Sequence, residues 1–195
     1  MTDSRDPHGR RHKRGYLPHF DAPGFAQFVT FRLNGSLPRS IVETLKFKFE
    51  TKQINEIEYH WEVEKALDAG SGPTHLKDER IADLVSAAIT HFDGKRYELN
   101  SWVLMPNHAH MLLCPFDEFE MSAIMHSIKS FTATKANRIL GLSGRFWSPD
   151  YYDRFIRDRR HFLSTVKYIE ENPVKAGLCR TPAEWKWSSA YRSAE

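Results

Sequence analysis

Met105-Pro-Asn-His-Ala-His-Met-Leu-Leu113 (MPNHAHMLL) decides the fold, because it joins a tight turn to a strand that carries two histidines. Side chains two residues apart on a strand share a face, so His108 and His110 converge and Ala109 faces the other side. Two such imidazoles can share a divalent ion when a third ligand arrives from elsewhere. Hydrogen-bonded or surface histidines are the competing interpretation, and the pair alone does not exclude them.

Hydrophobic periodicity outward from this stretch predicts the order β-α-α-β-β-α-β-α. Pro173 is expected to stop the last helix. Two central strands joined by a tight turn and flanked by helices indicate an α+β fold of the split-βαβ, ferredoxin-like kind. The predicted strands cover residues 25–33, 97–105, 108–114 and 146–156, and the predicted helices cover about 41–67, 81–92, 121–140 and 160–171.

The 195 residues suffice for one domain, and 41% hydrophobic residues indicate a globular chain. We expect a basic arm and loop over residues 1–24 and a single catalytic domain over residues 25–195. The net charge of +3 is modest but unevenly distributed. The arm suits a polyphosphate partner, although a solubilising tail is the alternative. Its basic side chains are Arg10, Arg11, Lys13 and Arg14.

The two cysteines, Cys114 and Cys179, form neither a metal-binding spacing nor a disulfide framework. They therefore predict a reduced, cytoplasmic chain. The N-terminus lacks the apolar core of a signal peptide, and no apolar run approaches the ~18 residues of a membrane span. We expect no membrane association.

The stretch Tyr168-Ile-Glu-Glu-Asn172 places a phenol and an amide four residues apart, on one face of the last predicted helix. A phenol with a pKa near ~10 needs help to attack at neutral pH, and a nearby ion could provide it. Asn172 could be the third ligand of that ion. A core tyrosine, followed by an Asn that precedes the helix stop, is the competing interpretation. The rival nucleophiles Tyr151 and Tyr152 lie in a strand-like segment with no ligand four residues on.

Four motifs follow one another in a fixed order: MPNHAHMLL (105–113), GRFWSPDYYDRFIR (144–157), YIEENPVKAGL (168–178) and EWKWSS (184–189). Together they resemble the REP-associated tyrosine transposases. These bacterial enzymes belong to the single-tyrosine HUH endonuclease superfamily, in which two histidines flank a hydrophobic residue. The opening GYLPHF (15–20) is also similar, and the likeness runs from about Gly15 to Tyr191.

The resemblance implies an HUH-type fold, with an antiparallel sheet, packed helices and a C-terminal helix that bears the tyrosine. It also implies a single-stranded DNA endonuclease and strand transferase that cleaves near hairpins. By the family pattern, His108 and His110 bind Mg²⁺ or Mn²⁺, and Asn172 takes the place of the third ligand. Tyr168 takes the nucleophile's place and would form a covalent 5′-phosphotyrosine intermediate.

Single-stranded or hairpin DNA is therefore the expected partner of a nucleoid-associated monomer, rather than of a helix-swapped dimer. The alternative is a non-catalytic DNA-binding protein derived from a transposase. A histidine-based phosphohydrolase or a structural zinc protein matches less well, because the sequence has neither a second His-x-Thr/Ser motif nor four closed ligands. The expected DNA contacts are Arg10, Arg11, Lys13, Arg14, Arg154, Arg157 and Lys175.

Overall fold

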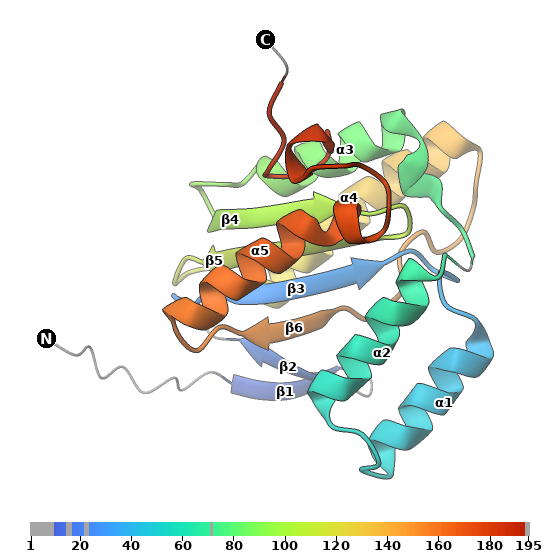
Figure 1. Cartoon of the computed structure of the whole chain (residues 1–195), viewed down its shortest axis with the longest axis vertical. Coiled ribbons are helices and arrows are strands. Elements are labelled where there is room, and N and C mark those ends of the chain that lie inside the picture. Colours follow the sequence, from blue (N-terminus) through green and yellow to red (C-terminus); the bar gives the residue numbers. More distant parts are fainter. Residues whose placement is uncertain (1–9, 15–16, 22–23, 71, 194–195) are drawn as a thin grey trace, which may run out of the picture.

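A four-stranded antiparallel sheet with the strand order β4-β5-β3-β6 forms the centre of the fold (Figure 1). The computed structural model describes residues 10–14, 17–21, 24–70 and 72–193. The first and third strands of the sheet in chain order are its two central strands, which is the arrangement expected of a split-βαβ fold. The strands are β3 (Gln27–Arg32), β4 (Tyr97–Leu104), β5 (His108–Pro115) and β6 (Tyr152–Phe155).

Helices cover both faces of this sheet. Side chains of α3 and α4 pack on one face, and α5 crosses the other face (Figure 1). No described helix is both long and apolar enough to cross a bilayer. The helices are α1 (Arg39–Glu50), α2 (Glu56–Asp68), α3 (Glu79–Thr90), α4 (Met121–Leu140) and α5 (Arg159–Lys175), with 3₁₀ turns η1 (His75–Lys77) and η2 (Pro182–Glu184).

The central strand β5 divides its side chains between the two faces. Ala109, Met111 and Leu113 belong to the core shared with α3 and α4. Leu112 belongs to the core beneath α5, and His108 and His110 project to the same side. Because both faces are covered, the whole strand is buried apart from one intermediate position, which explains its near-continuous apolar sequence.

The turn between β4 and β5 is fixed to the end of α2. The amide nitrogen of Asn107 donates a hydrogen bond to the carbonyl of Leu67 at 2.9 Å. Asn107 and Leu67 are both buried. This bond holds α2 beside the first residues of β5, where the two histidines begin.

The single helix predicted for residues 41–67 is two helices, α1 and α2. Lys52 adopts a left-handed backbone with φ 57°, which ends the first helix. Asn55 then caps the second, because its side chain accepts hydrogen bonds from the backbone nitrogens of Ile57 and Glu58. The Glu58 side chain bonds back to the backbone of Asn55, which completes a capping box.

The N-terminal arm contains a two-stranded antiparallel hairpin, β1 (Arg10–Arg14) and β2 (Leu17–Asp21). The sequence pattern predicts no strand within the arm and loop of residues 1–24, so this prediction is wrong for β1 and β2. The division into an arm (1–24) and a catalytic domain (25–195) stays a prediction.

Two other element boundaries also differ from the sequence prediction. Helix α5 continues past Pro173 to Lys175, so this proline ends the helix only after half a turn more. Proline lacks the amide hydrogen that would bond to the carbonyl four residues earlier, and only two helical residues follow it. The strand predicted at 146–156 is regular only over Tyr152–Phe155, with an isolated bridge between Trp147 and Leu33.

Candidate active site

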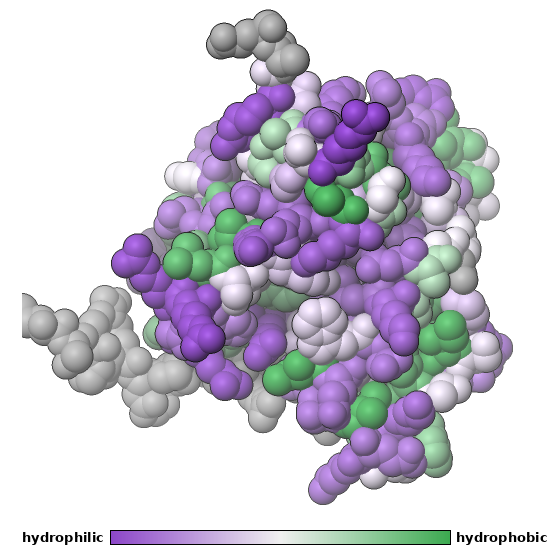
Figure 2. Space-filling view, viewed as in Figure 1, coloured by the Kyte–Doolittle hydropathy of each residue, from purple (hydrophilic) through white to green (hydrophobic). Residues whose placement is uncertain are grey.

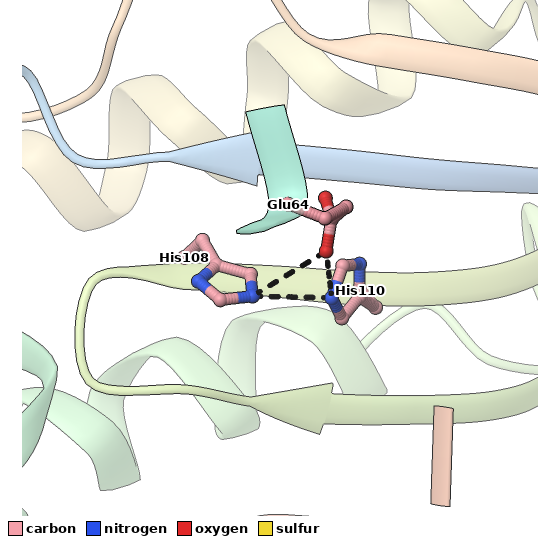
Figure 3. A group of neighbouring side chains, drawn as sticks. All are labelled: Glu64, His108 and His110. Carbon is pink, nitrogen blue, oxygen red and sulfur yellow. Dashed lines mark hydrogen bonds and ion pairs between the residues drawn. The ribbon is translucent and has the colours of Figure 1, made fainter. Parts of the chain in front are cut away.

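Three buried side chains from two distant segments meet on the α5 side of the sheet (Figure 3). Glu64 comes from α2, and His108 and His110 come from β5. The Oε2 atom of Glu64 lies 3.1 Å from Nε2 of His110 and 3.9 Å from Nε2 of His108. The two Nε2 atoms are 3.1 Å apart. Three potential ligand atoms thus point at one small volume.

The outer nitrogens of both imidazoles are held by neighbouring polar side chains. Nδ1 of His108 lies 2.6 Å from the Asn107 amide oxygen, and Nδ1 of His110 lies 2.8 Å from the Thr30 hydroxyl. The amide of Asn107 is oriented by its bond to Leu67, so its oxygen can only accept from His108. The proton of His108 therefore sits on Nδ1, and the lone pair on Nε2 faces Glu64.

Burial sets the charges in this pocket. It lowers the pKa of His108 to about 3, and the nearby His110 contributes in the same direction. His108 is therefore neutral at physiological pH. Burial alone would raise the pKa of Glu64, but attraction to His110 and His60 outweighs it, and the net pKa lies well below its ordinary value. Glu64 is therefore a carboxylate.

Tyr168 on α5 reaches the same pocket. Its hydroxyl donates a hydrogen bond to Oε2 of Glu64 at 2.9 Å, and its ring centroid lies 5.6 Å from that of His110. Burial and the negative charge of Glu64 raise the pKa of the phenol, which stays protonated. The buried Asn172, one helical turn further along α5, acts in the opposite direction and lowers the pKa of the phenol.

The donor set fits a divalent cation. Ligand atoms around an octahedral ion at about 2.1 Å lie about 3 Å apart, close to the two shorter separations observed here. Among the described residues, the second oxygen of Glu64, Oε1, is buried without a hydrogen-bond partner. A cation between these three atoms would accept the nitrogen lone pairs and offset the negative charge of Glu64. Imidazoles with one carboxylate suit Mn²⁺ and softer metals better than Mg²⁺.

The structure brings the four predicted site residues together. His108 and His110 from β5 meet Tyr168 from α5 at Glu64, and the buried Asn172 follows Tyr168 by one helical turn. Their roles stay predictions, as does the assignment of Asn172 to the ion.

Sequence reasoning missed Glu64. It is one of several acidic residues on α2, and nothing in its residue type distinguishes it from the others. One signal was available in the spacing. His60, Glu64 and Leu67 are spaced i, i+4 and i+7, which places the carboxylate on the buried face of the helix.

The predicted DNA-contact residues lie at different distances from the pocket. Arg154 in β6 is partly buried beside Tyr168, in a cavity that both residues line. Arg157 is exposed. Lys175 is exposed at the end of α5, with its ammonium 5.3 Å from the centre of the Tyr168 ring. The side chains of Arg10, Arg11, Lys13 and Arg14 lie outside the described part of the structure, and all seven assignments stay predictions.

The rival tyrosines are placed differently. Tyr152 lies in β6, and its ring stacks on His60 at 4.0 Å, while burial raises its pKa. Tyr151 belongs to the core on the opposite side of the sheet from Glu64. Tyr168 is the tyrosine whose hydroxyl is hydrogen-bonded to Glu64.

Comparison with known proteins identifies relatives of this chain. The family model described as "Transposase IS200 like" matches residues 74–172. A REP-associated tyrosine transposase of Escherichia coli (strain K12) is 29% identical over 97 residues, which cover 49% of this chain and 56% of that protein. The chain thus matches little more than half the length of this curated relative.

Two solved structures also align with this one. A REP-associated tyrosine transposase bound to a REP hairpin has a TM-score of 0.56 and 21% identity, and the alignment covers 92% of this chain and 82% of the other. A transposase-like structure from Deinococcus radiodurans aligns with a TM-score of 0.39 and 14% identity over 84% of this chain and 97% of the other, too low to establish a shared fold.

The predicted α+β fold is confirmed by the strand order of the sheet and by the first of these structures. The matched family segment begins after α2, so it contains both histidines, Tyr168 and Asn172 but not Glu64. The chain belongs to the IS200-like transposase family, and its predicted resemblance to the REP-associated tyrosine transposases is confirmed.

Proposed function

We propose that this protein is a metal-dependent endonuclease and strand transferase for single-stranded DNA, with Tyr168 as its nucleophile. One observation carries the proposal: a single carboxylate oxygen, Oε2 of Glu64, accepts the Tyr168 hydroxyl at 2.9 Å and faces both imidazoles. The phenol and the pair of nitrogen ligands thus share one centre. A nucleophile placed beside an ion pocket suits in-line displacement at phosphorus.

His108, His110 and Glu64 would hold the ion, with Asn172 as the further ligand expected from the family pattern. A bound Mg²⁺ or Mn²⁺ supplies Lewis-acid polarisation of a phosphate oxygen and offsets the negative charge of Glu64. Asn107 and Thr30 orient the two imidazoles, so the chain holds this ligand set in place before the ion arrives.

Tyr168 and Glu64 would carry out the proton and bond changes. The Tyr168 Oη would attack the scissile phosphorus, its proton would pass by way of the Glu64 carboxylate to water, and the bond from phosphorus to the 3′-oxygen would break. The products are a 5′-phosphotyrosine and a strand whose 3′-oxygen takes a proton from water. Because the phosphodiester energy stays in the tyrosyl bond, a 3′-hydroxyl from another strand can reverse the step.

A DNA hairpin is the proposed partner. The solved relative is bound to a REP hairpin, and a basic arm with Arg154 and Arg157 would supply phosphate contacts to a similar ligand. We keep the expectation that the protein acts as a monomer in the nucleoid. Here α5 reaches the histidines of its own chain, which needs no exchange of the tyrosine helix.

The test uses labelled single-stranded hairpins from the flanks of the gene, incubated with the full chain and Mn²⁺ or Mg²⁺. We expect a covalent protein–DNA complex that survives denaturing electrophoresis and disappears when EDTA is added. Tyr168→Phe should remove the complex while hairpin binding persists, because the change deletes one hydroxyl from a half-buried ring.

Tyr152→Phe is the matched control, since it removes a hydroxyl from a neighbouring buried tyrosine and should leave the complex unchanged. Tight hairpin binding with no covalent complex in either metal would favour the alternative, a non-catalytic DNA-binding protein. An undiminished complex with Tyr168→Phe would exclude Tyr168 as the nucleophile.

A further inference from the structure

A cavity of about 260 Å³ lies between α2, β6 and α5, directly beside the candidate active site. Tyr168 lines the cavity and also reaches the ion pocket. The cavity is also lined by His60, Trp61, Arg154, His161 and Thr165. Trp61 and His60 come from α2, which precedes the segment matched by the family model.

From this cavity we infer a binding site for one nucleotide of a single strand, the one next to the phosphate that Tyr168 attacks, with Trp61 as the platform for its base. The inference rests on the proposed role of Tyr168. A phosphate that reaches the phenol brings its neighbouring nucleotide into the adjoining space. The cavity provides that space at the edge of the pocket.

The aromatic residues of the cavity suit a base. Trp61 is 58% exposed, although a tryptophan is among the most costly side chains to leave in water. Its ring packs against that of Tyr168 in a T-shaped contact at 6.0 Å, which holds the indole at the cavity. A base stacks on such a ring whatever its sequence, so the site needs no specific base contacts.

The charges suit the backbone of the strand. Arg154 lies close enough to His161 to lower the pKa of that imidazole, in addition to the larger effect of burial. None of the described residues lining the cavity is acidic. A guanidinium can bind a phosphate through two parallel hydrogen bonds.

The surrounding surface favours a nucleic acid over an apolar partner. The face that carries α2 and α5 is largely hydrophilic, and its hydrophobic patches are separate from one another (Figure 2). A protein or lipid partner usually needs a continuous apolar area. A stacked base needs only one aromatic ring and a nearby cation.

The test measures binding without cleavage, with the full chain carrying Tyr168→Phe. The probe is a fluorescein-labelled oligothymidylate of about ten nucleotides, followed by anisotropy. We expect Trp61→Ala to weaken binding about five- to fifty-fold, in line with the stacking of one base. Trp61→Phe should recover most of the affinity. Phe47→Ala is the control, because Phe47 is an equally exposed aromatic residue (59%) on α1.

Further measurements identify what occupies the cavity. A strand of the same length without bases should bind Trp61→Ala as tightly as it binds the protein with Trp61. A duplex should likewise bind the two proteins with equal affinity. Arg154→Gln should lower the slope of log K against log salt concentration for oligothymidylate binding by about one. Unchanged oligothymidylate affinity in Trp61→Ala, or an equal loss with the base-free strand or the duplex, would overturn the inference.

These outcomes are separable from the proposed nuclease activity. A Trp61 effect with no covalent complex in the hairpin assay would leave the nucleotide site standing and remove only the role of Tyr168. A covalent complex with no Trp61 effect would remove only the nucleotide site.

Discussion

At the scale of single residues, the account depends on one carboxylate. Glu64 accepts a hydrogen bond from the Tyr168 phenol and lies against both histidines in a buried pocket. An isolated buried carboxylate is costly unless it is paired or bound to a metal. Glu64 lies on α2, before the matched family segment, and is the candidate third ligand beside the predicted pair of histidines.

Glu64→Gln tests this role. The change keeps the size of the side chain and removes its charge, so we expect the affinity for Mn²⁺ to fall about tenfold or more. Titration calorimetry of the metal-free protein measures it. Glu62→Gln is the matched control, because Glu62 is exposed on the same helix. Equal affinities for Mn²⁺ in the parent and Glu64→Gln would exclude Glu64 as a ligand.

At the scale of helices and strands, Asn107 connects the two elements that build the pocket. It bonds the end of α2 through the Leu67 carbonyl and His108 through its amide oxygen. A shift of α2 relative to β5 would therefore separate Glu64 from the histidines. The capping box at Asn55 fixes where this helix begins.

Asn107→Ala should act on both stability and metal binding. It removes the buried hydrogen bond to the Leu67 carbonyl and leaves His108 Nδ1 without its acceptor, so the free energy of unfolding should fall by about 1–3 kcal/mol. Loss of the bond that orients His108 should weaken Mn²⁺ binding by about ten- to a hundredfold. Urea denaturation and calorimetry measure the two effects. Asn107→Asp retains an acceptor for His108, so its metal affinity should exceed that of Asn107→Ala, and equal affinities would contradict the orienting role.

Local sequence patterns were sufficient to predict most helices and strands. They were also sufficient to predict which residues of β5 and α5 are candidates for the site. The strand period places His108 and His110 on one face, and the helix period places Tyr168 and Asn172 on another. Glu64 was not predictable in the same way, because its role arises from a tertiary contact between residues 44 and 104 positions apart in the chain. The break between α1 and α2 was missed because their apolar spacing continues across it, while Asn55 supplies the local cap.

At the scale of the whole molecule, buried uncharged histidines make folding sensitive to acid. Burial lowers the pKa of His60 to about 4, below its ordinary value of 6.5. As the pH falls through 6.5, the unfolded chain takes up a proton on this residue, whereas the folded chain does so only near pH 4. Stability from His60 is therefore complete above pH 6.5 and is lost between 6.5 and about 4.

The expected loss from His60 across that window is on the order of 3 kcal/mol. Urea unfolding at a series of pH values, in the presence of EDTA, measures it. His60→Gln cannot take up this proton, so its stability should fall less steeply over the same range, and His91→Gln is a surface control. Parallel curves for the parent and His60→Gln would show that His60 does not carry the effect.

The most direct measurement is the identification of the residue that carries DNA after reaction. The full chain is incubated with a cleavable hairpin and Mn²⁺, digested with protease and nuclease, and sequenced by tandem mass spectrometry. The account predicts a nucleotide joined through phosphate to Tyr168, in the peptide that also contains Asn172. A nucleotide on Tyr151, Tyr152 or any other residue would contradict it.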